Sequence, residues 1–186
     1  MSVVTISQYD NSFKECKDIF IKKTIDYGTS WRSLRIISIT DQIFIKAMRI
    51  RTIQEKKVQK VEDGIISEFK GIVNYGIIGL IQLSIGNAMV DDMEIGAVNS
   101  AYDIQAEVAR KTMLDKNHDY GEAWRDMSQE SFVDLIITKL SRIKQILSND
   151  GKTMISEGID ANFIDIINYA VFGLILIEEG KSGHQS

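Results

Sequence analysis

The sequence predicts an all-α protein made of two tandem three-helix units, packed as one helical bundle with pseudo-twofold symmetry. The phrase KTIDYGTSW at residues 23–31 returns as KNHDYGEAW at residues 116–124, with Lys, Asp, Tyr, Gly and Trp at the same spacing. Proline is absent from all 186 residues. Apolar residues recur at three- and four-residue intervals, whereas the alternation typical of strands is hard to find; both features favour helices.

The repetition extends well beyond this phrase. A shift of 93 residues superimposes Tyr9 on Tyr102 and then Arg49-Ile50 on Arg142-Ile143. After one inserted residue, a shift of 94 superimposes Phe69, Asn74-Tyr75 and Gly79-Leu80 on Phe163, Asn168-Tyr169 and Gly173-Leu174. Matches spread over roughly 75 residues indicate a duplicated structural unit.

Each unit is predicted to contain three helices. The first ends at the DYG phrase, where Gly28 and Gly121 stand at a position that requires positive φ. The second surrounds Lys46 or Lys139, and the third runs through the Asn-Tyr pair. We expect a first repeat over residues 1–85, a connector over 86–100, a second repeat over 101–177 and a flexible tail over 178–186. Because each unit buries its apolar faces best against the other, the repeats should form one compact domain.

Composition excludes several classes of protein. A net charge of -4 argues against binding to duplex DNA, which requires a basic face. Cys16, the single cysteine, rules out an internal disulfide and a Cys-rich zinc site, so we expect a cytoplasmic protein. The N-terminus does not resemble a secretory signal, and the apolar runs are too short to span a membrane. GxxxxGK and HExxH motifs are absent.

Acidic residues cluster on the predicted last helix. Glu157, Asp160, Asp165 and Asn168 share one face, and the turns that follow are apolar on all sides. The carboxylates should therefore point toward the interior. Burying an unpaired charge costs several kcal/mol, so these groups need either Mg²⁺ or Lys and Arg side chains as partners.

Basic residues on the second helix of each unit can serve either purpose. Lys139 and Arg142 are neighbours on one helix face, where they can pair with carboxylates or bind a phosphate group. Asp119 lies at the negative end of a helix dipole, which Lys116 can offset one turn earlier. An unfavourable acid that occurs in both units is also typical of a metal or nucleotide site.

The combination of K-x-x-D-Y-G with a following aromatic residue, K-x-x-R-I, and an acidic helix closing in N-Y resembles the nucleotide modification associated domain family, whose members often carry the domain twice. The resemblance covers nearly the entire chain and implies a link to nucleotide metabolism or modified bases. The second unit matches better, because Ile66 and Gly71 in the first unit replace Asp160 and Asp165. We therefore expect the first site to have decayed.

A looser similarity connects the chain to the all-α NTP pyrophosphohydrolases of MazG type, which bind Mg²⁺ through E-x-x-D or E-x-x-E pairs on adjacent helices. The first helix carries such a pair at Glu15 and Asp18. In this interpretation, carboxylate oxygens hold Mg²⁺ ions that bridge a triphosphate and activate water.

We therefore expect a nucleotide-binding protein that acts as a Mg²⁺-dependent (deoxy)nucleoside triphosphate pyrophosphohydrolase. Its metal ligands would be Glu157, Asp160 and Asp165, which would also be catalytic, together with Glu15 and Asp18. The predicted substrate-binding residues are Lys116, Asp119, Tyr120, Trp124, Lys139, Arg142 and Asn168. The alternatives are a non-catalytic helical interaction module and an accessory subunit of a nucleotide-modifying system. Formation of a homodimer is left open.

Overall fold

The fold was established from a computed structural model that describes residues 2–57, 64–90, 93–154 and 157–183. The α-helices in these ranges are α1 (Val3–Tyr27), α2 (Ile36–Lys56), α3 (Ile65–Ile85), α4 (Ile95–Tyr120), α5 (Gln129–Ser148) and α6 (Ile159–Gly183). Short 3₁₀ helices η1 (Ser30–Ser33) and η2 (Ala123–Asp126) follow α1 and α4. No strand occurs within these ranges, and the prediction of an all-α fold is confirmed.

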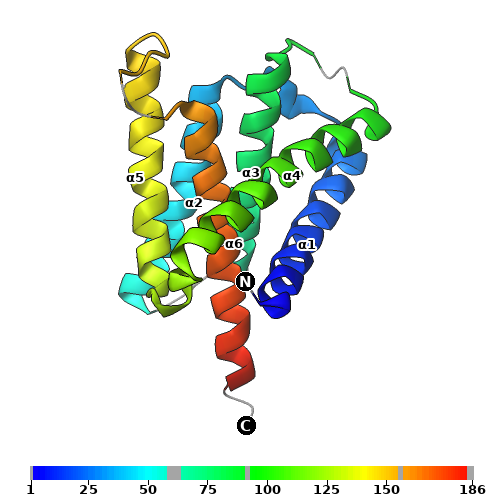
Figure 1. The fold of residues 1–186 in the computed structure, drawn as a ribbon. Helices are drawn as coiled ribbons and strands as arrows, with labels where there is room; N and C mark the ends of the chain where they lie inside the picture. The colour runs from blue at the N-terminus through cyan, green and yellow to red at the C-terminus, as the bar shows by residue number, and fades with distance from the viewer. Residues whose placement is uncertain (1, 58–63, 91–92, 155–156, 184–186) are drawn as a thin grey trace.

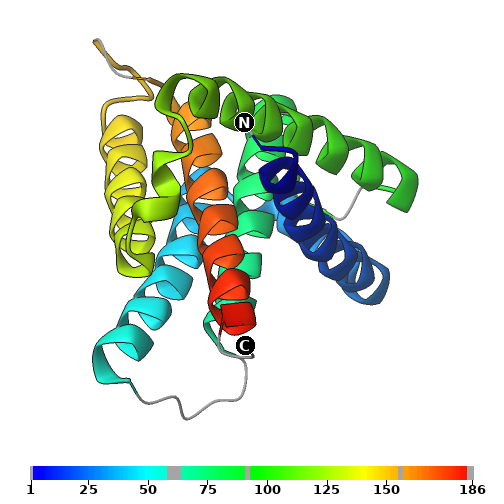
Figure 2. The ribbon, with the colours of Figure 1, turned by 60° about the horizontal axis from the view of Figure 1, so that its bottom comes forward.

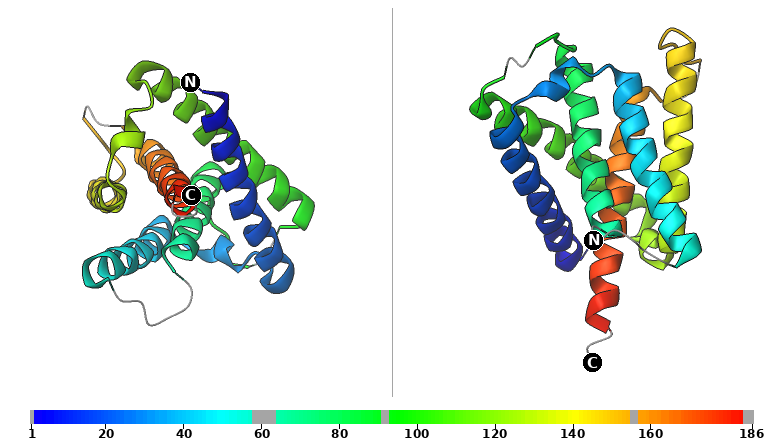
Figure 3. Two further views of the ribbon diagram at one scale, coloured as in Figure 1. Left: turned by 90° about the horizontal axis from the view of Figure 1, so that it is seen from below. Right: turned by 180° about the vertical axis from the view of Figure 1, so that it is seen from behind.

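The helices form three layers. Helices α3 and α6 lie antiparallel in the middle, α2 and α5 cover one side of this pair, and α1 and α4 cover the other (Figures 1 and 3). Each layer therefore contains one helix from the first repeat, α1–α3, and its equivalent from the second repeat, α4–α6. This pairing is the pseudo-twofold arrangement that the duplicated sequence predicts.

The contact between α3 and α6 explains why particular residues recur in both repeats. A Cβ atom on Gly79 would lie 2.8 Å from the Phe163 ring, and one on Gly173 would lie 2.9 Å from the Phe69 ring. Each glycine thus leaves room for the phenylalanine of the other repeat. The two reciprocal contacts bring the central helices close together, and both phenylalanines are fully buried.

Hydrogen bonds connect the outer helices of one repeat to the central helix of the other. Tyr9 of α1 donates to Asn168 Oδ1 of α6 at 2.7 Å, and Tyr102 of α4 donates to Asn74 Oδ1 of α3 at 2.8 Å. Helices α1 and α4 run across the central pair in Figure 2. The repeats are consequently interlocked, with each supplying a tyrosine to the core of the other.

The glycines of the two DYG phrases end α1 and α4 as predicted. Gly28 has φ 70° and its amide donates to the Thr24 carbonyl at 2.8 Å. Gly121 has φ 60° and its amide donates to the Asn117 carbonyl at 3.0 Å. A residue with a Cβ atom is disfavoured in this conformation, which accounts for glycine in both copies.

Helices α4 and α6 differ in extent from the sequence-based expectation. Helix α4 already begins at Ile95, within the connector predicted over residues 86–100. Helix α6 begins at Ile159, after Glu157, and continues to Gly183 through part of the tail predicted from residue 178. Glu179 accepts hydrogen bonds from Gln8 and from Arg125, which hold this last segment against α1 and η2.

One helix in the described part of the chain is long and apolar enough to cross a membrane by length and composition. It is the Ile159–Gly180 segment of α6, most of which is buried inside the bundle. The core helix of a globular protein meets the same criteria, so the segment is weak support for a membrane span.

Candidate functional site

Asp165 is the buried carboxylate of α6, and two lysines neutralise it. Its side chain is 7% exposed. Lys116 Nζ of α4 donates to its Oδ1 atom and Lys139 Nζ of α5 to its Oδ2 atom, both at 2.6 Å. Burial lowers the pKa of Lys116, but the hydrogen bond and charge of Asp165 outweigh burial and raise the pKa above its usual value. Of the two kinds of partner expected for this carboxylate, the structure shows lysines.

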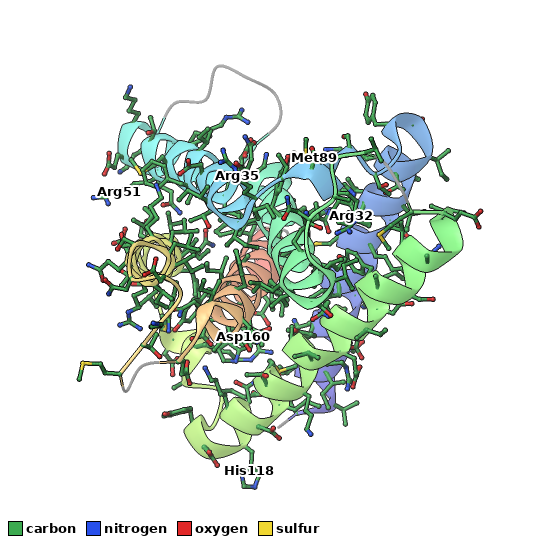
Figure 4. The ribbon with its side chains drawn as sticks, turned by 90° about the horizontal axis from the view of Figure 1, so that it is seen from above. Arg32, Arg35, Arg51, Met89, His118 and Asp160 are labelled. Atoms are coloured by element: carbon green, nitrogen blue, oxygen red, sulfur yellow. The ribbon has the colours of Figure 1, made fainter. Side chains whose placement is uncertain are left out.

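The other two acids of the expected metal site do not join Asp165. Glu157 is exposed and lies with Arg142 at an open hollow beside the end of α5. Asp160 is exposed at the start of α6, in a separate hollow facing α3 and α4 (Figure 4). Within the described ranges, no three His, Cys, Asp or Glu side chains come together as metal ligands would. The expectation that all three carboxylates point inward is therefore wrong for Glu157 and Asp160, because one precedes the helix and the other faces solvent in its first turn.

The E-x-x-D pair of α1 is also separate from Asp165. Glu15 and Asp18 are both exposed. Glu15 Oε2 lies 2.7 Å from Lys70 Nζ of α3, so its near neighbour is a lysine of the first repeat. Glu15 shares a hollow with Glu178 of α6, and neither Asp160 nor Asp165 is among the described lining residues of that hollow.

Four further residues predicted to bind substrate in the second repeat are divided between the solvent-exposed surface and the packed core. Asp119 and Tyr120 project into solvent, with side chain and residue exposures of 75% and 73%. Trp124 is buried and stacks on Phe172, with ring centroids 4.2 Å apart. Asn168 accepts from Tyr9 and donates to the Ala109 carbonyl at 3.1 Å, so it connects three helices of the bundle.

A cavity lies instead in the first repeat, where α1, η1, α2 and α3 meet. Its volume is about 290 Å³, and we call it the first-repeat pocket. Among the lining residues that the structure describes, several are aromatic, three are lysines and none is acidic. The lining includes Lys23, Lys46, Lys70, Gly71, Trp31, Tyr75 and Ile78.

The same place in the second repeat is filled by two larger side chains. Asp165 stands where the first repeat has Gly71, and Phe172 stands where it has Ile78. The carboxylate joins the two lysines equivalent to Lys23 and Lys46, while the phenyl ring covers the tryptophan equivalent to Trp31. In the first repeat, the smaller Gly71 and Ile78 line the cavity, and the Lys46 side chain lies against Gly71.

The lysines of the first-repeat pocket are only partly neutralised by the protein. Lys46 Nζ lies 3.5 Å from Glu68 Oε2, but Glu68 is bound more closely by Arg49. Lys70 pairs with Glu15, whose side chain is 62% exposed, and such exposed pairs contribute little. The pocket therefore presents positive charge that a ligand can neutralise.

The sequence alone pointed to the second repeat because it has the more complete set of acidic residues. The pocket lies in the repeat that lacks one of these acids, where Gly71 replaces the equivalent of Asp165. Gly71 and the preceding basic residue of α3, Lys70, are visible in the alignment of the two repeats, where the second repeat has Asp165 and Ile164. The replacement of Asp165 by Gly71 predicted a decayed site, whereas in the structure Gly71 lines the pocket.

The fold and the pocket together define a duplicated all-α protein with a lysine-lined cavity. The family model described as nucleotide modification associated domain 1 matches residues 23–83 and 116–177, and the chain belongs to this family. The two matched segments agree with a tandem copy. No curated protein and no solved structure matches the chain. The looser similarity to MazG-type enzymes stays a prediction.

Proposed function

We propose that the protein binds a nucleotide in the first-repeat pocket. The observation that carries this proposal is a cavity with three lysines, several aromatic rings and no acidic lining residue in the described part of the chain. The matched family description supports the same class of ligand. Binding at this pocket replaces the second-repeat site as the leading interpretation.

The lysines account for recognition of phosphate. Lys23 of α1, Lys46 of α2 and Lys70 of α3 reach the cavity from three different helices. Ammonium groups form charge-assisted hydrogen bonds with phosphate oxygens, and several around one cavity share the charge of a diphosphate or triphosphate. No metal ion is needed for this mode of binding.

The aromatic residues account for recognition of a base. Trp31 and Tyr75 line the cavity, and the Lys46 ammonium lies 5.8 Å from the centre of the Tyr75 ring. Bases stack on such rings with about 1–3 kcal/mol each in known complexes. A volume of about 290 Å³ is at the small end of small-molecule sites, which suits a mononucleotide better than a polymer.

Hydrolysis of the nucleotide by the expected Mg²⁺-dependent mechanism stays a prediction. The carboxylates assigned to it lie at separate places, and those of Glu157 and Asp160 line hollows other than the first-repeat pocket. The geometry therefore supports binding more directly than pyrophosphate release. Both are measured in the same experiment below.

The test is isothermal titration of the full chain with a panel of ribo- and deoxynucleoside mono-, di- and triphosphates, with and without Mg²⁺. Lys23→Ala should weaken binding about tenfold or more, the cost of losing a charged hydrogen bond. Lys22→Ala is the matched control, because Lys22 is exposed and is not among the described lining residues. Its affinity should equal that of the unaltered protein.

Two outcomes would refute the proposal. One is the absence of heat with every nucleotide at millimolar concentration; the other is equal affinity of the Lys23→Ala and Lys22→Ala proteins. Pyrophosphate release measured on the same samples tests hydrolysis separately. The first outcome would favour the non-catalytic interaction module.

A further inference from the structure

The two repeats differ at one position in a way that identifies where a ligand's charge belongs. In the second repeat, Lys116 and Lys139 both contact the Asp165 carboxylate at 2.6 Å. Their equivalents Lys23 and Lys46 line the first-repeat pocket. The residue equivalent to Asp165 is Gly71, which contributes no side chain.

One of these lysines, Lys46, lies directly against Gly71. A Cβ atom built on Gly71 would lie 2.9 Å from Lys46 Cε and 3.2 Å from Lys46 Nζ. An acidic side chain at residue 71 would thus meet the Lys46 ammonium, as Asp165 meets Lys139. Lysines stand at the equivalent positions of both repeats, while the anion between them is part of the chain in only one.

We propose that the Asp165 carboxylate is a built-in substitute for the anionic group of the ligand. In the first repeat, the flexible end of the Lys46 side chain moves aside from Gly71, and a phosphate of the ligand takes the equivalent position and contacts Lys23 and Lys46. The second repeat is closed by its own aspartate and by Phe172, so each chain binds one ligand. This inference rests on the proposed function, because it assigns the position and number of the ligands that the first-repeat pocket takes.

The difference between the repeats also has an electrostatic reason. Lys139 is 12% exposed, and a buried ammonium without a counter-ion is costly. The second repeat meets this cost with Asp165. In the first repeat, Lys46 is partly paired with Glu68 and also lines the cavity, where an anion from solution can bind.

The test compares two substitutions of equal size, Gly71→Asp and Gly71→Asn. Asparagine occupies the same volume as aspartate but adds no charge. Binding is measured by titration calorimetry with inorganic pyrophosphate and with the nucleotide that binds the unaltered protein most tightly. If the inference holds, Gly71→Asp weakens binding about a hundredfold or more, because it neutralises the lysines and repels the phosphate. Gly71→Asn should bind at least ten times more tightly than Gly71→Asp.

Folding of the variants is checked by thermal unfolding. The Gly71→Asp protein should melt no lower than the Gly71→Asn protein, because its new carboxylate pairs with Lys46 as Asp165 pairs with Lys139. A much lower melting temperature would contradict the inference directly, since it would mean that an anion is not accommodated at this position.

The outcomes separate this inference from the proposed function. If the unaltered protein binds neither pyrophosphate nor any nucleotide, the proposed function fails. If the unaltered protein binds but Gly71→Asp and Gly71→Asn have equal affinities, the proposed function stands. The inference that the Asp165 carboxylate takes the place of the ligand's anionic group is then refuted. A stoichiometry of two ligands per chain would likewise overturn the inference, whereas one ligand per chain is the expected result.

Discussion

Asp165 has the clearest role of any ionisable residue in the second repeat. Its carboxylate holds Lys116 and Lys139 together between α4, α5 and α6. Such a triad stabilises the packing of three helices, and it explains how an acid is accommodated among the buried residues of α6. The same acid was expected to bind Mg²⁺; its close partners in the structure are ammonium groups.

We predict that Asp165→Asn lowers the free energy of unfolding by about 3 kcal/mol, because it leaves Lys139 buried without a counter-ion. Urea denaturation measures this value. Asp160→Asn is the control, since Asp160 is exposed, and its effect should stay within about 0.5 kcal/mol. Equal effects of the two substitutions would contradict a structural role specific to Asp165.

Cys16 provides a prediction about pH. Burial raises the pKa of its thiol to about 12 from the ordinary value of 9.0. Between these values the unfolded chain loses the proton and the folded chain keeps it, so stability is fully present below pH 9 and decreases as pH rises toward 12. The Cys16→Ala protein should therefore lose stability less steeply over this range in urea denaturation at a series of pH values. Identical slopes for both proteins would refute the assignment.

The hydrogen bonds that Tyr9 and Tyr102 donate across the repeats determine how whole helices pack. Tyr9 and Tyr102 each donate to the asparagine of the other repeat and thereby position α1 and α4 on the central pair. We predict that Tyr9→Phe and Tyr102→Phe each lower the free energy of unfolding by about 1–3 kcal/mol, because each leaves a buried amide oxygen without its donor.

Thermal or urea unfolding measures both effects. Tyr120→Phe is the control, since that residue is 73% exposed, and it should leave stability unchanged. Were Tyr9→Phe and Tyr102→Phe equally neutral, the connections would not contribute to packing.

The helices, and the ends of α1 and α4 at the DYG phrases, were well predicted from sequence, because the 3.6-residue pattern, the absence of proline and the glycines at 28 and 121 all act locally. The C-terminal part of α6 was missed because tertiary bonds to Glu179 hold it. The site was harder to predict. Sequence shows which groups are present, and it indicated the acids of the second repeat, whereas the pocket arises from the missing side chain of Gly71 and the smaller Ile78.

At the scale of the whole molecule, the two repeats depend on each other. Phe69 and Phe163 pack against glycines of the opposite repeat, and the tyrosine bonds cross in the same way. We predict that residues 1–90 alone do not fold, because α3 would expose the face that α6 covers. Two-dimensional NMR should show poorly dispersed amide signals for this fragment. Well-dispersed signals with cooperative unfolding would show that each repeat is an independent domain.

Duplication followed by divergence gives this molecule one open and one closed version of the same arrangement. The closed version stabilises the bundle through an internal anion, and the open version offers equivalent lysines to an external one. Under the proposed function, a protein built in this way gains ligand binding at one repeat without losing the packing that both require.

The central claim is best tested by a crystal structure of the full chain with the nucleotide that binds most tightly in calorimetry. We predict phosphate oxygens at about 2.7–2.9 Å from the ammonium groups of Lys23 and Lys46, beside Gly71. A nucleotide located instead at the hollow of Arg142 and Glu157, with the first-repeat pocket unoccupied, would contradict the claim.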